Sequence, residues 1–152
     1  MAKRLKIYLD TSVPNAYFDE KNLLRKETTR RFWKRIGEYE VFVSDLVLAE
    51  IDDIRDEGKK KGLVTLLGEI KVLSSKEAEI KTLAQEYVSR GIIPVKHIED
   101  AVHIAVASFH SMDVLISWNF EHIVKLKTKR EVNAINVLLG YNQLEIVEPS
   151  MV

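Results

Sequence analysis

One short segment near the N-terminus, Lys6–Ser12, constrains the fold more than any other part of the sequence. It opens within an apolar run at residues 5–9, whose residue types are typical of a β-strand. The run stops at Asp10, and Ser12 and Pro14 then suit the cap and first turn of a helix. We therefore expect a strand, an acidic side chain at its carboxyl end and a helix directly after it. Ligands of open α/β sheets bind at that end of the strands, so Asp10 is either a site residue or only a turn residue or helix cap.

The pattern of strand followed by helix continues along the chain. Further strands are predicted at residues 40–44, 70–73, 113–117 and 144–147. Helices are predicted in two pieces between 14 and 37, at 45–56 and 63–67, from Ser75 until Gly91, at 97–107 and around 132–138. Gly58 and the lysines at 59–61 are expected to separate two of these helices. Strands that alternate with helices favour a parallel sheet between helical layers, formed by a single domain over residues 1–152.

Composition narrows the class of protein. The chain has 152 residues, of which 46% are hydrophobic and 30% are charged, as expected for a globular domain with its own core. It contains no cysteine, which excludes disulfides and thiolate metal sites. The apolar run at the N-terminus is too short for a signal peptide, and no later stretch is long enough to span a membrane, so we expect a cytoplasmic protein.

Charge is balanced overall but uneven along the sequence. Basic and acidic residues number 23 each, so the net charge does not indicate a nucleic-acid-binding protein. Basic residues nevertheless crowd three segments, at about 21–35, 59–61 and 125–130. Such runs are usually solvated helix faces, and contact with phosphates is the alternative for each of them.

Two further acids occupy positions where a carboxylate needs compensation. Glu50 interrupts an apolar helix, and Asp100 precedes the apolar run at 101–107, in a first helical turn where the helix dipole favours an anion. Both could converge with Asp10 at the carboxyl edge of the sheet. The chain has no cysteine, and its histidines are not spaced as a metal-binding pair on one helix, so oxygen ligands for Mg²⁺ or Mn²⁺ are the expected site. Such an ion can polarise a phosphate and activate water to attack it.

Taken in order, these motifs resemble a PIN domain, and most closely the VapC-like group of type II toxin–antitoxin ribonucleases. The motifs are Asp10-Thr11-Ser12, Ser44 to Glu50, Asp100 to Ala105, Leu115-Ile116-Ser117-Trp118-Asn119 and the tail from Asn133 to Tyr141. The resemblance extends over nearly the whole chain. It implies an α/β fold, namely a PIN-like three-layer α/β/α sandwich with a central parallel sheet of about five strands.

The resemblance also assigns roles to residues. It implies that Asp10, Glu50 and Asp100 are acidic ligands of Mg²⁺ or Mn²⁺ and are therefore catalytic. Asn119 would take the fourth position of the site, which is often aspartate in this family. An amide brings no charge, so the three carboxylates would suffice for one divalent ion and be marginal for a second. The number of ions, one or two, stays open.

The same resemblance implies an activity and its partners. The activity is hydrolysis of RNA phosphodiester bonds by an endoribonuclease, the toxin of a toxin–antitoxin pair. The partners are the RNA substrate, a small protein antitoxin and a second copy of the chain in a homodimer. Ser12 and Ser117 would support the site.

A few residues near the motifs allow two interpretations. Trp118 could stack on an RNA base or could cover the core. Lys125 and Lys127 follow the Asn119 turn, and we expect them to contact RNA. His103 is expected to be a packed, hydrogen-bonded helix residue in preference to a catalyst.

Two rival functions stay open. A strand that ends in Asp10 followed by Thr11 also begins haloacid-dehalogenase-like phosphatases, but those need a second aspartate where this chain has Ser12. The other rival is a catalytically weak PIN fold that only binds RNA or a protein, and Asn119 in place of an acid is its support.

Overall fold

The computed structural model describes residues 3–152; residues 1 and 2, which the predicted domain range includes, lie outside the described residues. The strands are β1 (Lys6–Leu9), β2 (Glu40–Ser44), β3 (Lys71–Leu73), β4 (Val114–Ile116) and β5 (Glu145–Val147). The helices are α1 (Ser12–Ala16), α2 (Leu23–Lys34), α3 (Asp45–Asp52), α4 (Glu57–Leu66), α5 (Ala78–Ser89), α6 (Ile98–Phe109) and α7 (Leu126–Leu138). Short 3-10 turns cover Ile36–Glu38, Val95–His97 and Pro149–Met151. Within residues 3–152, every helix is too short or too polar to cross a bilayer.

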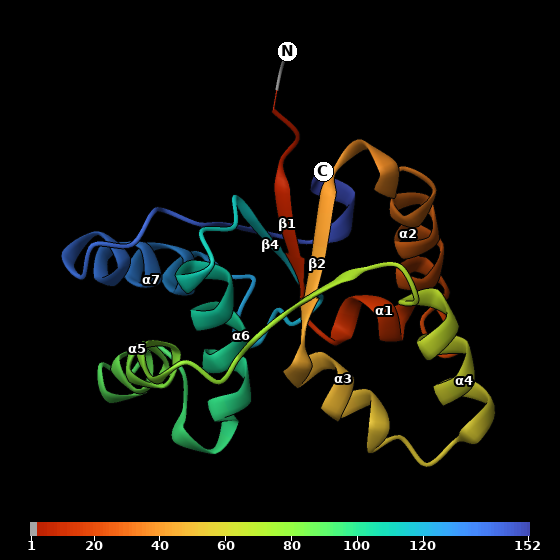
Figure 1. Cartoon of the computed structure of the whole chain (residues 1–152), viewed down its shortest axis with the longest axis horizontal. Coiled ribbons are helices and arrows are strands. Elements are labelled where there is room, and N and C mark those ends of the chain that lie inside the picture. The colour runs from red at the N-terminus through yellow and green to blue at the C-terminus, as the bar shows by residue number, and fades with distance from the viewer. Residues whose placement is uncertain (1–2) are drawn as a thin grey trace.

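The five strands form one sheet in the order β3-β2-β1-β4-β5, and every pair is parallel. The first strand is therefore central: Ile7 lies opposite Val41 of β2 on one side and opposite Val114 of β4 on the other. Figure 1 shows α5, α6 and α7 on one side of the strands, and α1, α2 and α4 on the other. The predicted parallel α/β sandwich is confirmed.

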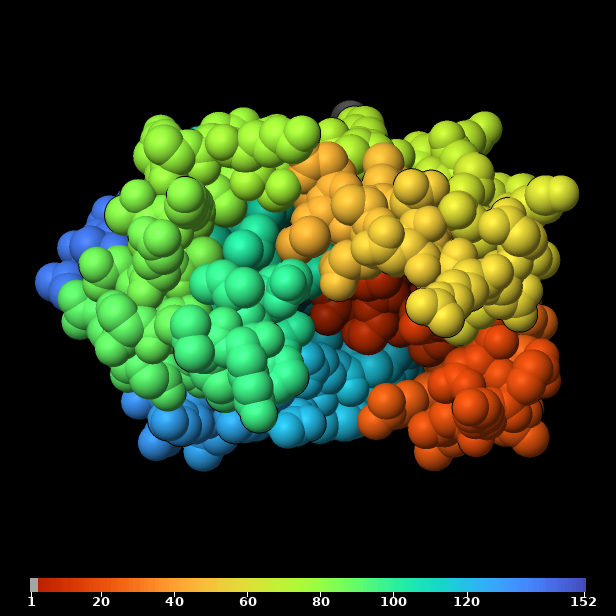
Figure 2. Space-filling model, turned by 90° about the horizontal axis from the view of Figure 1, so that it is seen from below, coloured from red at the N-terminus to blue at the C-terminus, as the bar shows by residue number. Residues whose placement is uncertain are grey.

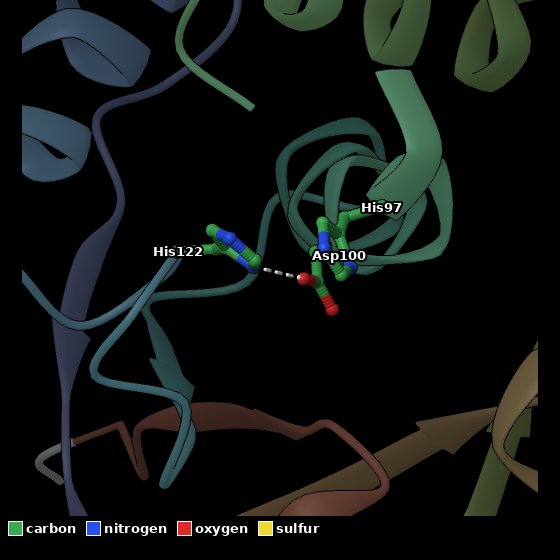
Figure 3. Close-up of side chains that lie close together, drawn as sticks. All are labelled: His97, Asp100 and His122. Carbon is green, nitrogen blue, oxygen red and sulfur yellow. Dashed lines mark hydrogen bonds and ion pairs between the residues drawn. The ribbon is translucent and has the colours of Figure 1, made fainter. Parts of the chain in front are cut away.

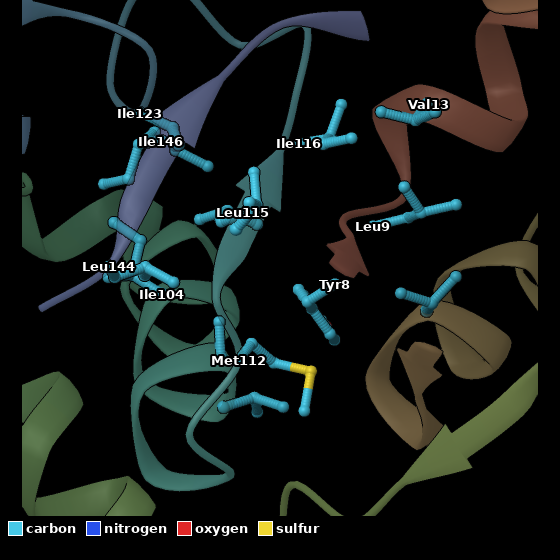
Figure 4. Close-up of a cluster of buried hydrophobic side chains, with 14 of the residues drawn as sticks. Tyr8, Leu9, Val13, Ile104, Met112, Leu115, Ile116, Ile123, Leu144 and Ile146 are labelled. Carbon is cyan, nitrogen blue, oxygen red and sulfur yellow. The ribbon is translucent and has the colours of Figure 1, made fainter. Parts of the chain in front are cut away.

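Burial explains why the central strands are continuously apolar. Both faces of a parallel sheet are covered by helices, so alternate residues cannot turn towards water. Ile7, Tyr8 and Leu9 are all 0% exposed, and Figure 4 shows side chains of β1 and β4 packed into one cluster with Ile104 of α6. A charged residue directly after such a strand, such as Asp10, therefore lies at the edge of the core.

The chain order of the strands creates a crevice at one end of β1. After β1 the chain adds β2 and β3 on one side, then crosses over to add β4 and β5 on the other. The carboxyl ends of β1 and β4 are therefore neighbours whose connections leave in opposite directions, which is the usual ligand position in open α/β sheets. Figure 2, seen from this end, shows the dark red segment after β1 at the floor of a hollow between the segments of α3, α6 and the turn after β4.

Three predicted helix boundaries are wrong, and the first is the end of α3, which lies at Asp52 and not at about Asp56. The structure continues α4 through Gly58 and the lysines at 59–61, because the Asp56 side chain accepts a hydrogen bond from the Lys59 backbone at 3.1 Å and caps a helix that begins before the glycine. Ser75 does not begin α5, because its backbone and hydroxyl both donate to the Asp45 carboxylate. At α4 and at Ser75, a side-chain hydrogen bond accounts for the difference.

The Asp56 cap gives a prediction for stability. Asp56→Ala should lower the free energy of unfolding by about 1 kcal/mol, because the first turn of α4 loses its side-chain acceptor. Asp53→Ala is the matched control, since Asp53 is also exposed and lies at the end of α3. Urea unfolding of both variants measures the difference, and equal stabilities would show that the cap does not hold α4.

Candidate active site

Asp10 lies directly after β1 at the crevice, and it is almost completely buried, with 4% of its surface exposed. Its Oδ1 accepts hydrogen bonds from the Ser12 hydroxyl at 2.5 Å and the Ser12 backbone at 3.1 Å. Its Oδ2 accepts one from the Ser117 hydroxyl at 2.6 Å. Burial raises the pKa of Asp10, and the Asp100 charge adds to this, while His103 and the two serine hydroxyls oppose it. Asp10 is thus a fixed carboxylate whose charge is poorly compensated within the protein.

The two serines join the loops that follow β1 and β4. Besides bonding Asp10, the Ser12 hydroxyl accepts the Trp118 backbone N–H at 2.9 Å, and the Ser117 hydroxyl accepts that of Asn119 at 2.9 Å. Both residues therefore hold the Asp10 carboxylate and the loop after β4 at once. The structure places Ser12 and Ser117 where supporting residues are expected.

Glu50 approaches the same edge from α3 and is half-buried. Its Oε1 accepts the Thr11 hydroxyl at 2.7 Å and lies 2.7 Å from Nε2 of His103. Burial alone would raise the pKa of Glu50, but the hydrogen bond and charge of His103, together with Thr11, lower it overall. Glu50 is therefore an ionised group with a built-in partner.

His103 connects this acid to the core of the sheet. It is 3% exposed, and its Nδ1 lies 2.7 Å from the Tyr8 hydroxyl, which lies 2.7 Å from the Ser44 hydroxyl. A line of hydrogen bonds thus runs from β2 through β1 and α6 to Glu50 on α3. The expectation that His103 is packed and hydrogen-bonded agrees with this position.

Asp100 lies in the first turn of α6 and pairs with a histidine that sequence analysis did not consider. Its Oδ2 is 3.0 Å from Nδ1 of His122, and His97 lies beside both. Within residues 3–152, His97, Asp100 and His122 each offer a possible ligand atom, and these three atoms lie within 4.8 Å of one another. The three predicted acids do not form such a set. Asp100 still acts on the charge of Asp10, so the acids share one edge of the sheet without being in contact.

Asn119, the predicted fourth position, has a structural task. Its side-chain carbonyl accepts the His122 backbone N–H at 2.9 Å and so caps the turn at 119–122. The side chain also lines the pocket next to Ser12. An Asn at this position is therefore explained by the turn without invoking a metal.

A pocket of about 480 Å³, which we call the basic pocket, opens beside Ser12 and Asn119, and its wall carries three basic side chains and the acids Asp19 and Glu20. Lys21, Arg25 and Lys59 line it, together with Trp118. Trp118 is 8% exposed, its indole N–H donates to the Thr29 hydroxyl at 2.9 Å, and the Arg25 guanidinium lies 5.3 Å from its ring centre. This burial favours the core interpretation of Trp118 over base stacking.

Lys125 and Lys127 lie elsewhere. Both are exposed, and the Lys127 ammonium lies 3.4 Å from the Gly91 carbonyl and 3.9 Å from the Glu131 carboxylate. The residues that line the basic pocket do not include either lysine. The basic pocket beside Asp10 is made instead by the two earlier basic segments of the sequence.

The acids suit a hard divalent cation. Asp10, Glu50 and Asp100 offer carboxylate oxygens at one sheet edge, and oxygen is the ligand that Mg²⁺ and Mn²⁺ prefer. Burying the Asp10 charge without a cation is unfavourable, as its raised pKa indicates. A bound cation would relieve that penalty, so the residues present fit such an ion.

Comparison with known proteins identifies the fold. The chain matches no protein-family model and no curated protein sequence. Its structure is similar to FitAcB from Neisseria gonorrhoeae, with a TM-score of 0.62 at 17% identity over 96% of this chain and 99% of that one. VapC20 from Mycobacterium tuberculosis, a toxin that cleaves the sarcin-ricin loop, gives 0.58 at 18% identity over 76% and 92%. DNA-bound VapBC from Salmonella typhimurium gives 0.59 at 14% identity over 95% and 98%. The chain has the VapC-like PIN fold that its motifs predict.

The surroundings of Asp10 predict opposite effects for two substitutions. Since burial raises the folded-state pKa of Asp10, the native state binds the extra proton, and wild-type stability should fall as pH rises through that pKa. Asp10→Asn removes this dependence and keeps a carbonyl for Ser12, so in EDTA at neutral pH it should be at least as stable as wild type. Asp10→Ala leaves two serine hydroxyls without their acceptor and should cost about 1–3 kcal/mol. Urea unfolding across a pH series measures the free energy of unfolding of each variant. A lower value for Asp10→Asn than for Asp10→Ala would contradict the prediction.

Proposed function

We propose that this chain, with the fold of the VapC toxins, is a metal-dependent endoribonuclease and the toxin of a toxin–antitoxin pair. The observation that carries the proposal is the buried Asp10 carboxylate at the strand crevice, with Glu50 and Asp100 at the same sheet edge. The similarity to VapC20, a toxin that cleaves the sarcin-ricin loop, supports RNA as the substrate.

The roles of the residues follow from their contacts. Asp10, Glu50 and Asp100 would hold Mg²⁺ or Mn²⁺, with Asn119 at the fourth position. The ion would supply polarisation of the phosphodiester and activation of water. Ser12 fixes the direction of the Asp10 carboxylate, and because the serine hydroxyl hydrogens already point at it, its oxygens are presented without rearrangement.

His103 performs the corresponding task for Glu50. Its ring is held between the Tyr8 hydroxyl and the Glu50 carboxylate, which fixes the position of the acid on a short helix. The hydrogen bond to Tyr8 uses the other ring nitrogen, so it would hold the His103 ring in place while a cation bound Glu50. His103 is therefore a positioning residue in this proposal.

RNA binding is assigned to the basic pocket. A chain with zero net charge needs a local excess of positive charge to attract a polyanion, and in this pocket Lys21, Arg25 and Lys59 outnumber the acids Asp19 and Glu20. Lys125 and Lys127, with Trp118, are the alternative contacts expected from the sequence. The two lysine sets lie in different places, so substitution can separate them.

The same comparison supports a protein partner. FitAcB and the VapBC assemblies are complexes, and two VapBC structures, from Rickettsia felis and Salmonella typhimurium, contain DNA. We infer that this chain binds a small protein antitoxin, forms a homodimer and works in the cytoplasm.

A binding-only PIN domain is the second candidate. The observation in its favour is that Glu50 and Asp100 each already have a histidine partner and that Asn119 caps a turn. A haloacid-dehalogenase-like phosphatase gains no such support, because Ser12 stands where the second aspartate is needed and donates its hydroxyl to Asp10.

Cleavage of RNA separates the two candidates. Wild type should cleave generic RNA with Mn²⁺ and stop when EDTA is added, and Asp10→Asn should slow cleavage at least about a hundredfold, or ~3 kcal/mol in the transition state. Asp52→Asn is the control, because Asp52 is an exposed acid at the end of α3 whose partner is Lys60. A wild type that binds RNA but shows no Mn²⁺-dependent cleavage would leave the binding module as the function.

The location of the RNA groove is tested by paired variants. Arg25→Gln with Lys59→Gln should weaken RNA binding more than Lys125→Gln with Lys127→Gln, because only the first pair lines the pocket. The slope of affinity against salt should also fall by about one for each phosphate contact that is lost. Fluorescence anisotropy over a salt series, using the Asp10→Asn background to prevent cleavage, measures both quantities. The opposite order of effects would place the groove near α7.

A further inference from the structure

We propose that His97, Asp100 and His122 form a binding site for Zn²⁺, separate in chemistry from the acidic site described above. One potential ligand atom from each residue lies within 4.8 Å of the other two. Figure 3 shows His122 reaching from the loop after β4 towards Asp100 at the start of α6, with His97 beside them. Two imidazoles and one carboxylate provide mainly nitrogen ligands, whereas Mg²⁺ and Mn²⁺ prefer oxygen ligands.

The three side chains are brought together by tertiary structure. His97 and Asp100 are three residues apart at the beginning of α6, so they lie on one face of that helical turn. His122 arrives from the turn after β4, and its ring centre is 4.3 Å from that of His97. Its Nδ1 is 3.0 Å from Oδ2 of Asp100. The site thus closes a contact between two segments that are distant in sequence.

The backbone of His122 is fixed on both sides. Its N–H donates to the Asn119 side chain at 2.9 Å, and its carbonyl accepts the buried Thr128 hydroxyl at 2.8 Å. The residue is 8% exposed, whereas His97 is only partly buried. A fixed ligand paired with a more accessible one allows an ion to enter without unfolding the turn.

The other nitrogen of His122 is near a carboxylate. Its Nε2 lies 3.5 Å from the exposed Glu121 carboxylate, and a carboxylate on that side favours a hydrogen on Nε2, with Nδ1 as the lone-pair donor. Zinc would replace the hydrogen now shared between Nδ1 and Asp100, and any proton carried there would pass to solvent. No oxidant or further reactant is needed.

The donor set selects the metal. Imidazole suits Zn²⁺ and its neighbours in the first transition row, whereas Mg²⁺ requires oxygen ligands. Zinc–nitrogen bonds of about 2 Å bring ligand atoms to within about 4 Å of one another, so a small rotation of His97 completes the set. Three protein ligands leave a fourth position for water, as in zinc sites that are open to solvent.

Asp100 belongs to both sites, which links them. An Asp100 carboxylate held by zinc is withdrawn from the acids that would hold Mg²⁺ or Mn²⁺, and this consequence alone rests on the proposed function. The zinc site itself stands on the three residues and their contacts. Its test therefore uses no RNA, so its failure and the failure of the proposed nuclease activity are separate results.

Calorimetric titration of the full chain with ZnCl₂ tests the site. Wild type should bind zinc, and His97→Ala should weaken that binding at least about tenfold, as loss of a group in a metal site does. His110→Ala is the matched control, because His110 is the C-cap of α6 as His97 is its N-cap, and it bonds the Ser74 carbonyl at the far end of the helix. The control should retain wild-type affinity.

Folding of the variants is checked by thermal unfolding in EDTA. His122→Ala is expected to lose zinc too, but it removes a buried ring, so His97→Ala decides the question. Zinc binding to His97→Ala with wild-type affinity, or no zinc binding to a folded wild type, overturns the proposal. Equal loss of affinity in His97→Ala and His110→Ala overturns it as well, because it would show a general effect on α6.

Discussion

The placement of one carboxylate at the end of the central strand governs the arrangement around it. Asp10 follows three fully buried residues of β1, so its position is dictated by the sheet and not by solvent. A buried charge is unfavourable unless it is hydrogen-bonded or paired. Ser12 and Ser117 supply the hydrogen bonds, yet the pKa of Asp10 stays raised by burial. The fold therefore holds a carboxylate that is fixed by hydrogen bonds but short of positive charge, and this is the condition under which a cation stabilises a protein.

The same edge depends on a polar line through the core. Tyr8 is the middle residue of a fully buried stretch of β1, and its hydroxyl could not lie there without partners. Ser44 and His103 provide them, and His103 in turn holds Glu50. Buried networks of this kind fix relative positions because every member loses a hydrogen bond if one moves. The orientation of α3 and α6 at the site is thus set from within the sheet.

Features that are local in sequence were predictable, and features that depend on tertiary contact were not. The strand runs and the acids after or near them follow from residue type and spacing, so the parallel sheet and the edge occupied by Asp10, Glu50 and Asp100 could be inferred. The start of α4 was missed because a single side chain, Asp56, outweighs the glycine that follows it. His122 carried no local signal at all: its partners, Asp100 and His97, are more than twenty residues away in sequence.

The three acids differ in how far the protein already neutralises them, and this difference orders their behaviour. Among residues 3–152, Glu50 has His103 and Asp100 has His122, whereas Asp10 has only hydroxyl and backbone donors in direct contact. A cation bound at this edge of the sheet would therefore interact most favourably with Asp10, and it would compete with an imidazole for each of the other two acids. Release of Glu50 would leave His103 with Tyr8 alone, and release of Asp100 would leave His122 with the more distant Glu121 carboxylate. Asp100 is the acid for which the fold least determines which cation it binds. His97 and His122 lie beside it, and its charge also acts on Asp10.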